Sequence, residues 1–233
     1  MRLQGSVPEA ADAPDPVVIE RFEGGPFAQN TFLVWCEEAR VAVIVDPGAG
    51  AGEALERVAA ENLELRAVLL THAHLDHVDG LPVVHAAFPE LPIWLHPDDQ
   101  GLYDAAPMQA QAFGMPVPDL PPVTDRFEPG TPVSFGGSLT FDVRFAPGHA
   151  PGHVVLVAFD AGEAIVGDVV FQGSIGRTDL PGGDLATLMR SIRDQILTLP
   201  PSMTLHPGHG PATTVQSERV GNPFLNGSYS GFA

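Results

Sequence analysis

The chain contains no lysine, so all of its positive charge is carried by arginine. This absence excludes Schiff-base chemistry, a P-loop lysine and a Ser-x-x-Lys nucleophile. There is one cysteine, Cys36, so no disulfide can form within the chain, and its apolar neighbours in FLVWC predict a buried strand thiol rather than a nucleophile. A lone thiol fits a reducing compartment, and we expect a cytoplasmic protein.

A basic surface is also missing. The formal net charge is −18 and the isoelectric point is near 4.6, which argues against nucleic acid or an anionic membrane as a partner. No run of residues is long and apolar enough to span a bilayer. Residues 1–16 lack the apolar core of a targeting peptide and are predicted to form a disordered arm, and residues 17–233 are predicted to form one domain.

Runs of β-branched and apolar residues alternate with helical patterns along the domain. The predicted order is several strands, then helices, then several strands, then a helix over 184–197 and a last strand over 203–208. This order predicts an α/β layered sandwich with two similar halves. The Pro-rich segment 105–122 is predicted to be a long surface loop that shapes a binding site, and Asp79 is predicted to cap a short helix over 81–88.

The stretch LLTHAHLDHVDG places three histidines and two aspartates behind an apolar strand. In an extended segment His72 and His74 point to the same side, whereas in a helix they would point to nearly opposite sides. His77 falls out of this alternation, so the chain must turn near Asp76 to bring the four side chains around one point. We therefore predict that this stretch leaves the end of a strand and forms part of a polar site.

Three other predicted strands end at a residue of the same kind, next to glycine: His149 in RFAPGH, Asp168 in AIVGD and His209 in TLHPGH. Neutral imidazole and carboxylate suit zinc, iron or manganese, and seven such groups exceed the needs of one tetrahedral ion. Each residue alone could merely cap a strand or turn. Four strand ends together favour a metal site with two ions.

These residues resemble the metallo-β-lactamase superfamily. THAHLDH matches its His-x-His-x-Asp-His signature, and APGHAPGH, VGDVVF and HPGHGP are similar to its later motifs, in the expected order. The resemblance implies a four-layer αββα sandwich with two divalent metal ions, zinc above iron or manganese. It implies that one ion is held by His72, His74 and His149, that the other is held by Asp76, His77 and His209, and that Asp168 and a hydroxide bridge them. Asp76 and Asp168 are then also the catalytic carboxylates.

Within the superfamily, GDVVFQGSIGRTDLPGGD is similar to the glyoxalase II group of hydroxyacylglutathione hydrolases, above all to the short bacterial form. In that group a basic residue at the place of Arg177 binds the glutathione carboxylate, and a guanidinium fork matches a carboxylate well. A local ion pair of Arg177 with Asp179 or Asp184 is the alternative. The chain has only a short tail where longer members carry a helical domain with further glutathione contacts, so the thiol carrier stays open.

The resemblance implies hydrolysis of a small-molecule thioester such as S-lactoylglutathione, because metal ions make hydroxide available near neutral pH and a thiolate leaves without a general acid. The alternatives are a mononuclear-iron persulfide dioxygenase, using residues that match His72, His149 and Asp168, and a non-catalytic metal-binding module on the same fold. A true β-lactamase fits less well, because the chain has no lysine for the antibiotic carboxylate and no cysteine near a ligand position. The oligomeric state stays open.

Several polar residues near these motifs are not assigned as ligands. His85 and His96 are expected to be structural. His153 and His206 either hydrogen-bond to ligands or only pack beside them. Asp46 in VIVDPG is predicted to orient a ligand imidazole, although Asp-Pro-Gly is also an ordinary turn.

Overall fold

Two six-stranded sheets face each other in the centre of the structure, a computed structural model that describes residues 15–227. In spatial order, the first sheet contains β1 (Val17–Gly24), β2 (Gln29–Cys36), β3 (Val41–Val45), β4 (Glu64–Leu69), β5 (Ile93–Leu95) and β6 (Asp125–Arg126). The second contains β14 (Thr213–Thr214), β13 (Thr204–Pro207), β10 (Glu163–Gly167), β9 (Val154–Ala158), β8 (Thr140–Phe145) and β7 (Val133–Ser134). A hairpin of β11 (Val170–Phe171) and β12 (Ser174–Ile175) stands apart from both.

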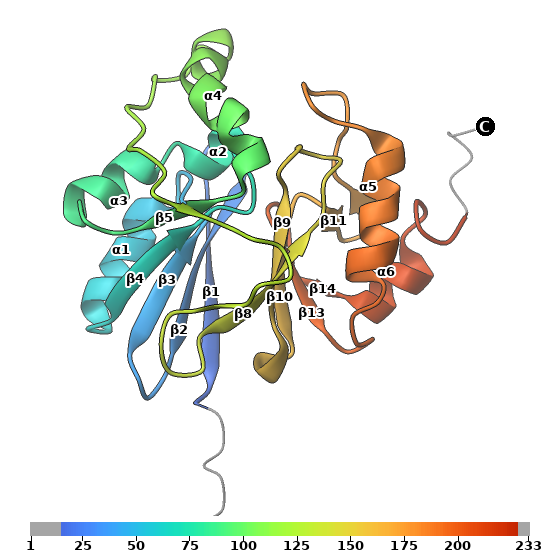
Figure 1. Cartoon of the computed structure of the whole chain (residues 1–233), viewed down its shortest axis with the longest axis horizontal. Helices are drawn as coiled ribbons and strands as arrows, with labels where there is room; N and C mark the ends of the chain where they lie inside the picture. The colour runs from blue at the N-terminus through green and yellow to red at the C-terminus, as the bar shows by residue number, and fades with distance from the viewer. Residues whose placement is uncertain (1–14, 228–233) are drawn as a thin grey trace, which may run out of the picture.

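Helices cover the outer face of each sheet (Figure 1). The first sheet is covered by α1 (Ala51–Ala60) and α3 (Leu81–Ala87), and the second by α5 (Leu185–Ser191) and α6 (Val215–Gly221). The helix α5 continues as a π-helical turn, Ile192–Ile196. The layer order is αββα, as the sequence predicted.

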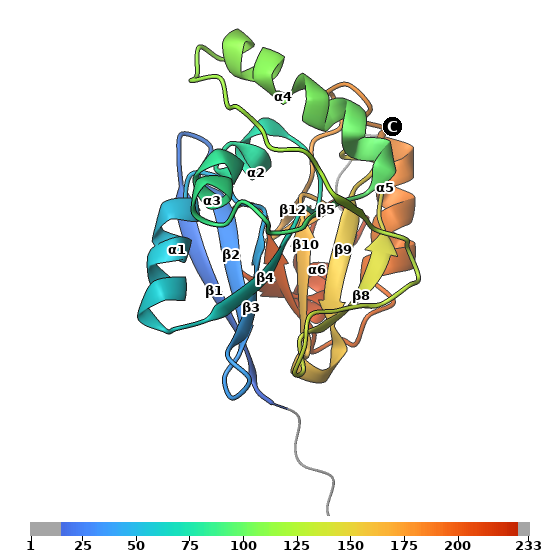
Figure 2. The same cartoon turned by 60° about the vertical axis from the view of Figure 1, so that its left-hand side comes forward.

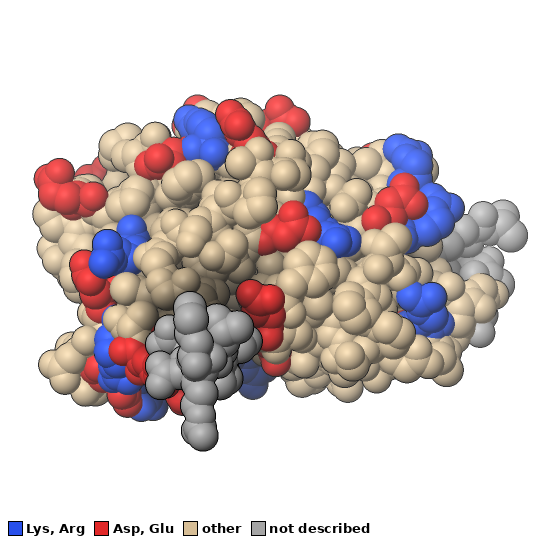
Figure 3. Space-filling view, turned by 60° about the horizontal axis from the view of Figure 1, so that its bottom comes forward, with Lys and Arg blue, Asp and Glu red and all other residues tan. Residues whose placement is uncertain are grey.

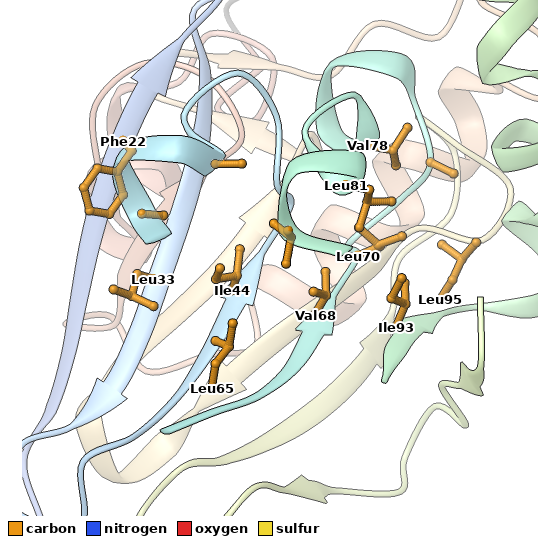
Figure 4. Close-up of a cluster of buried hydrophobic side chains, with 14 of the residues drawn as sticks. Phe22, Leu33, Ile44, Leu65, Val68, Leu70, Val78, Leu81, Ile93 and Leu95 are labelled. Carbon is orange, nitrogen blue, oxygen red and sulfur yellow. The ribbon is translucent and has the colours of Figure 1, made fainter. Parts of the chain in front are cut away.

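Side chains of the inner strands alternate between two apolar layers. Leu33 of β2 and Ile44 of β3 pack toward the helices, in the cluster that Figure 4 shows, whereas Phe32 and Val43 pack between the two sheets. A third apolar cluster joins the second sheet to α5. Every residue of β2 and β3 is buried, because strands covered on both faces have no solvent side.

Strand directions bring several carboxyl ends to one edge of the sandwich. In the second sheet β10 is parallel to β13, and β9 is antiparallel to both β10 and β8, so β8, β10 and β13 run the same way. In the first sheet β3, β4, β5 and β6 are parallel. The helices α2 (Leu75–Val78) and α4 (Gln100–Ala112) lie at the upper edge in Figure 2, with α4 crossing over it.

The prediction of a loop over 105–122 was wrong in its first part, because α4 extends to Ala112 with Pro107 inside it. The missing N–H of a proline costs about 3 kcal/mol in a helix interior. Here Tyr103, Ala106 and Ala110 are buried at helical spacing in the apolar cluster between the first sheet and its helices. The Tyr103 hydroxyl also donates to the Pro121 carbonyl over 2.6 Å. Burial of this face outweighs the local cost of the proline. From Met115 to Thr124 the chain is irregular, as predicted.

The prediction that Asp79 caps the helix over 81–88 was also wrong. Gly80 occupies the cap position of α3, and no side chain there accepts a capping hydrogen bond. Asp79 instead follows the one-turn helix α2, which the sequence did not suggest, and its N–H donates to the Leu75 carbonyl. The helix itself begins at Leu81, as predicted.

The predicted disordered arm, 1–16, falls almost wholly outside the described residues. Asp15 is described, and its carboxylate accepts hydrogen bonds from the backbone N–H groups of Glu38 and Ala39 over 2.8 and 2.9 Å. In the described part of the chain, no helix has the length and apolar character needed to cross a membrane.

Candidate metal centre

The THAHLDH stretch leaves the first sheet where β4 ends at Leu69. The backbone of His74 is extended, and α2 begins directly after it, so that Asp76 and His77 lie on the first helical turn. The Thr71 carbonyl accepts from the Val154 N–H of the second sheet over 2.8 Å, which ties the stretch to both sheets. Extension followed by a tight turn therefore aims all four polar side chains at one region, as predicted.

His149, Asp168 and His209 arrive from the second sheet, just after β8, β10 and β13 respectively. Because these three strands run the same way, their ends meet at one edge. The approach is close: a Cβ at Gly208 would lie 2.2 Å from the Oδ1 of Asp168 and 2.7 Å from the Cε1 of His77. Only glycine leaves room for those two side chains at this point.

The ligand atoms of the predicted sites form two clusters. His72, His74 and His149 each place one ring nitrogen within 4.8 Å of the others, and the Nδ1 of His74 lies 2.8 Å from the Nε2 of His149. Asp76, His77 and His209 form the second cluster under the same limit. All three histidines of the first cluster are buried, which is typical of a coordination site and unusual for free polar groups.

Asp168 lies between the two clusters. Its Oδ2 is 3.4 Å from the Nε2 of His149 and 3.4 Å from the Nε2 of His209, and its Oδ1 is 3.5 Å from the Nε2 of His77. One carboxylate therefore faces residues of both clusters. All seven side chains that the sequence singled out as metal ligands meet at this edge.

Protein oxygens hold the outer ring nitrogens of three of these histidines. The Nδ1 of His77 lies 3.0 Å from the Oδ2 of Asp46, the Nδ1 of His149 lies 2.8 Å from the Arg177 carbonyl, and the Nδ1 of His209 lies 3.0 Å from the Phe27 carbonyl. Such bonds fix the tautomer and turn the other nitrogen toward the centre. Asp46 therefore orients a ring of the site, as predicted.

Thr71 and His153 support the centre from behind. Thr71 donates through its hydroxyl to Asp46 over 2.6 Å. The Nε2 of His153 accepts from the Asp168 N–H over 3.0 Å, and its ring stacks on that of His72 with centroids 4.7 Å apart. His153 therefore hydrogen-bonds to a candidate ligand and does not merely pack beside it, and this bond helps to position Asp168.

The donor atoms fit divalent metal ions. The Nε2 atoms of His72 and His77 and the Oδ1 of Asp168 are buried and have no hydrogen-bond partner among the described residues. Buried polar atoms of this kind are rare unless they bind something. A set of imidazole nitrogens and carboxylate oxygens suits zinc, iron or manganese.

The electrostatics of the two clusters differ. Burial holds the pKa of His72 well below its usual value and lowers that of His74 to about 3, so both rings are neutral, as metal ligands must be. At His209 burial acts in the same direction, but hydrogen bonds to Asp168 and Asp76 outweigh it and raise the pKa to about 10. The second cluster is thus a place where positive charge is strongly favoured.

A cavity of about 350 Å³ opens above the centre. His74, Asp76, His149, Asp168 and His209 line its floor. The rest of its lining is largely apolar, and it includes Phe27, Leu75, Gln109, Phe113, Phe171, Ser174, Ile175, Arg177 and Leu180. Its size suits a small organic molecule.

Arg177 lines the cavity, but its guanidinium forms a forked pair with Asp179, with both N···O distances at 2.7 Å. Its side chain is 60% exposed. Asp184, the other candidate partner, instead caps α5 by accepting from the Thr187 N–H. The local ion pair considered from the sequence is therefore formed with Asp179.

Other polar residues proved structural. His206 lies 2.6 Å from Glu163 and His96 stacks on Phe145, and neither joins the two clusters. Cys36 is fully buried in β2, as predicted. Asp99 was not predicted from the sequence; its carboxylate accepts from the N–H groups of Ala73 and Gly152 and so joins the two histidine motifs. The cavity side chains Phe27 and Phe113 were not predicted either, because no local pattern in the sequence marks them.

Known proteins are similar to this chain over most of its length. The profile of the metallo-β-lactamase superfamily matches residues 24–209. The hydroxyacylglutathione hydrolase GloC of Haemophilus influenzae is 40% identical over 205 residues, which cover 86% of this chain and 94% of that protein.

Two solved structures are similar in both fold and sequence. The crystal structure of TTHA1623 in a di-iron-bound form superposes with a TM-score of 0.79 at 40% identity, covering 88% of this chain and all of that one. The structure of the B3 metallo-β-lactamase BLEG-1 superposes with a TM-score of 0.80 at 34% identity, covering 89% of this chain and 99% of that one.

Proposed function

The chain belongs to the metallo-β-lactamase superfamily, and we propose that it is a metal-dependent hydrolase of acylated thiols, acting on hydroxyacylglutathione thioesters such as S-lactoylglutathione. The observation that carries the proposal is the position of Asp168 between two clusters of three ligand side chains, at the floor of a cavity. The similarity to a hydroxyacylglutathione hydrolase over nearly its whole length supports the choice of substrate.

Two divalent ions fit the donor set. His72, His74 and His149 would hold one and Asp76, His77 and His209 the other, with Asp168 shared. Zinc is our first choice, and iron is supported by the di-iron form of a relative. When bound, such ions polarise a carbonyl group and lower the pKa of water to about 7.

The chain's own residues prepare this chemistry. The bonds from Asp46, the Arg177 carbonyl and the Phe27 carbonyl hold three imidazoles in one tautomer and one direction. Asp76 and Asp168 both line the cavity, so either carboxylate can orient a water by accepting its proton in a hydrogen bond. The leaving group is a thiolate, whose conjugate thiol has a pKa of about 8.5. It can therefore leave without a separate general acid.

Arg177 is the only arginine among the described residues that line the cavity. We propose that it contacts a carboxylate of the glutathione moiety. Its pair with Asp179 is exposed, and such pairs stabilise a protein by at most about 1 kcal/mol. A substrate carboxylate can therefore share or replace Asp179 at little cost.

We propose that the protein acts on a small molecule in the cytoplasm and that neither nucleic acid nor a membrane is its partner. On the face shown in Figure 3, most basic side chains lie beside acidic ones, and they do not gather into a large basic patch. The charge of −18 and the single buried cysteine support the same conclusion.

The decisive experiment is elemental analysis of the purified protein beside three assays: hydrolysis of S-lactoylglutathione, oxygen uptake with glutathione persulfide, and hydrolysis of a β-lactam. We expect about two ions per chain and thioester hydrolysis. One iron per chain with oxygen uptake would establish the dioxygenase alternative. A full metal complement with no turnover in any assay would support a non-catalytic metal-binding module.

A further inference from the structure

Two exposed phenylalanines meet at the mouth of the cavity. Phe27 lies at the tip of the hairpin between β1 and β2, and Phe113 follows the last residue of α4. Their ring centroids are 5.7 Å apart and the rings meet edge to face at 72°. Phe27 is 39% exposed and Phe113 is 58% exposed, although both line the cavity. Apolar surface left open beside a polar site is typical of a ligand contact.

The hairpin tip holds Phe27 in a defined place. Ala28 has a φ of 50° and Gly25 a φ of 70°, and the Ala28 N–H donates to the Gly25 carbonyl over 3.2 Å. A positive φ at alanine is uncommon, and such local strain often accompanies function. The Phe27 carbonyl also accepts from His209, so the same turn orients a metal ligand and presents an aromatic ring.

The segment that carries Phe113 has no charge. From Ala105 to Pro118 there is no acidic or basic residue, in a chain whose net charge is −18. Met108 is 67% exposed and Val117 is 50% exposed in the same segment. Gln109 and Phe113 are the residues of this segment that line the cavity, so its wall on this side is uncharged, next to imidazoles and carboxylates.

The two ligand clusters have different neighbours in the cavity. The Phe27 carbonyl accepts from His209 of the second cluster, and the ring of Phe171 lies 6.0 Å from that of His209. The Arg177 carbonyl accepts from His149 of the first cluster. A molecule that spans both clusters therefore has an aromatic end, beside His209, and an end beside Arg177.

We propose that Phe27 and Phe113 form a binding site for an aromatic or branched apolar group on the acyl part of the substrate. This inference rests on the proposed function, which puts the thioester carbon at the metal centre and the carboxylate-bearing thiol toward Arg177. The acyl group then points to the aromatic end. An aryl hydroxyacyl thioester fits this site better than the lactoyl compound, whose methyl group covers little of either ring.

The test compares S-mandeloylglutathione with S-lactoylglutathione, which differ in a phenyl ring against a methyl group. We expect kcat/KM of the metal-loaded protein to be higher for the mandeloyl compound by about tenfold or more, the selectivity typical of extra apolar contact in a pocket. Phe113→Ala should lower kcat/KM for the mandeloyl compound about tenfold more than for the lactoyl compound. Phe159→Ala is the matched control, because Phe159 is an exposed phenylalanine, at 47%, that does not line the cavity, and it should keep the wild-type preference.

A second readout does not depend on turnover. Mandelate and lactate are titrated by calorimetry into the metal-loaded wild type, Phe113→Ala and Phe27→Leu, with metal content measured for each. We expect mandelate to bind about tenfold more tightly than lactate to the wild type, and both variants to reduce this ratio. If no thioester is hydrolysed, the proposed function fails. The ratio of the dissociation constants of lactate and mandelate still tests the aromatic site in that case. Equal binding of the two acids, or a ratio unchanged in Phe113→Ala, would overturn the inference and leave the two rings as a closure of the cavity mouth.

Discussion

The Oδ2 of Asp46 lies 3.0 Å from the Nδ1 of His77, and both side chains are fully buried. The backbone of Asp46 has a φ of 50°, a conformation that asparagine also tolerates. This contact links a turn after β3 to a ligand candidate on α2. It offers a way to change the orientation of one imidazole without touching any proposed ligand.

Asp46→Asn should weaken metal binding by 10- to 100-fold, the usual loss when a partner of a ligand histidine is changed. The amide keeps the backbone conformation but supplies a weaker acceptor to His77 and to Thr71. Metal affinity is measured by competition with a chelator. Asp160→Asn is the matched control, since Asp160 is exposed in the turn before β10, at the far end of that strand from Asp168. Equal affinities for the two variants would contradict the role of Asp46.

Asp168→Asn should reduce metal binding more than Asp46→Asn does, because the Asp168 carboxylate faces residues of both clusters. We expect loss of at least one ion per chain and a fall in kcat of more than 100-fold, above the range for residues that act through a ligand. Elemental analysis and thioester turnover are measured on the same preparation. Retention of two ions with normal turnover would exclude Asp168 as a shared ligand.

Arg177→Ala tests the carboxylate contact. The variant should raise KM for S-lactoylglutathione about fivefold, which corresponds to the loss of about 1 kcal/mol at an exposed ion pair, with a much smaller change in kcat. Asp179→Ala should lower KM for S-lactoylglutathione, because the substitution frees the guanidinium for the substrate. An unchanged KM in both variants would remove Arg177 from substrate binding.

The environment of Asp99 predicts how the stability of the protein depends on pH. Burial raises the pKa of Asp99 to about 6, although the N–H groups of Gly152 and Ala73 favour the ionised form. Because the folded pKa is above the unfolded value of about 3.9, the contribution of Asp99 to stability is complete below pH 4 and is lost as pH rises through 6. The shift of about two units corresponds to up to about 3 kcal/mol.

Urea unfolding of the metal-free protein measures this contribution. Asp99→Asn has no group to titrate, so its free energy of unfolding, relative to wild type, should rise by up to about 3 kcal/mol between pH 4 and pH 7. The variant should be the less stable protein at pH 4, because an amide has one oxygen for two N–H donors. A difference that does not vary with pH would show that Asp99 keeps an ordinary pKa in the folded protein.

Local patterns in the sequence were enough for the layered fold and for the candidate ligands. Apolar runs predict strands because side chains alternate along an extended chain, and the seven candidate ligands follow strand ends or turns directly. The extension of His72 to His74 and the turn near Asp76 are likewise consequences of neighbouring residues. Asp46 was found for the same reason, since it directly follows an apolar strand.

Features that depend on distant partners could not be predicted. Pro107 lies in a helix because Tyr103 and its neighbours are buried on a surface made by other segments. The pair of Arg177 with Asp179 rather than Asp184 depends on the path of a loop. The contact of Phe27 with Phe113 joins a hairpin tip to the end of a helix, and no local pattern marks it.

The sequence by itself determined the layers of the fold and the side chains of the candidate metal centre, because strand alternation and ligand type are properties of short segments. Only the tertiary structure decided the shape and chemistry of the cavity above that centre. Its rim is assembled from the β1–β2 hairpin, the end of α4 and the β11–β12 hairpin, whose side chains meet through packing between segments far apart in the chain.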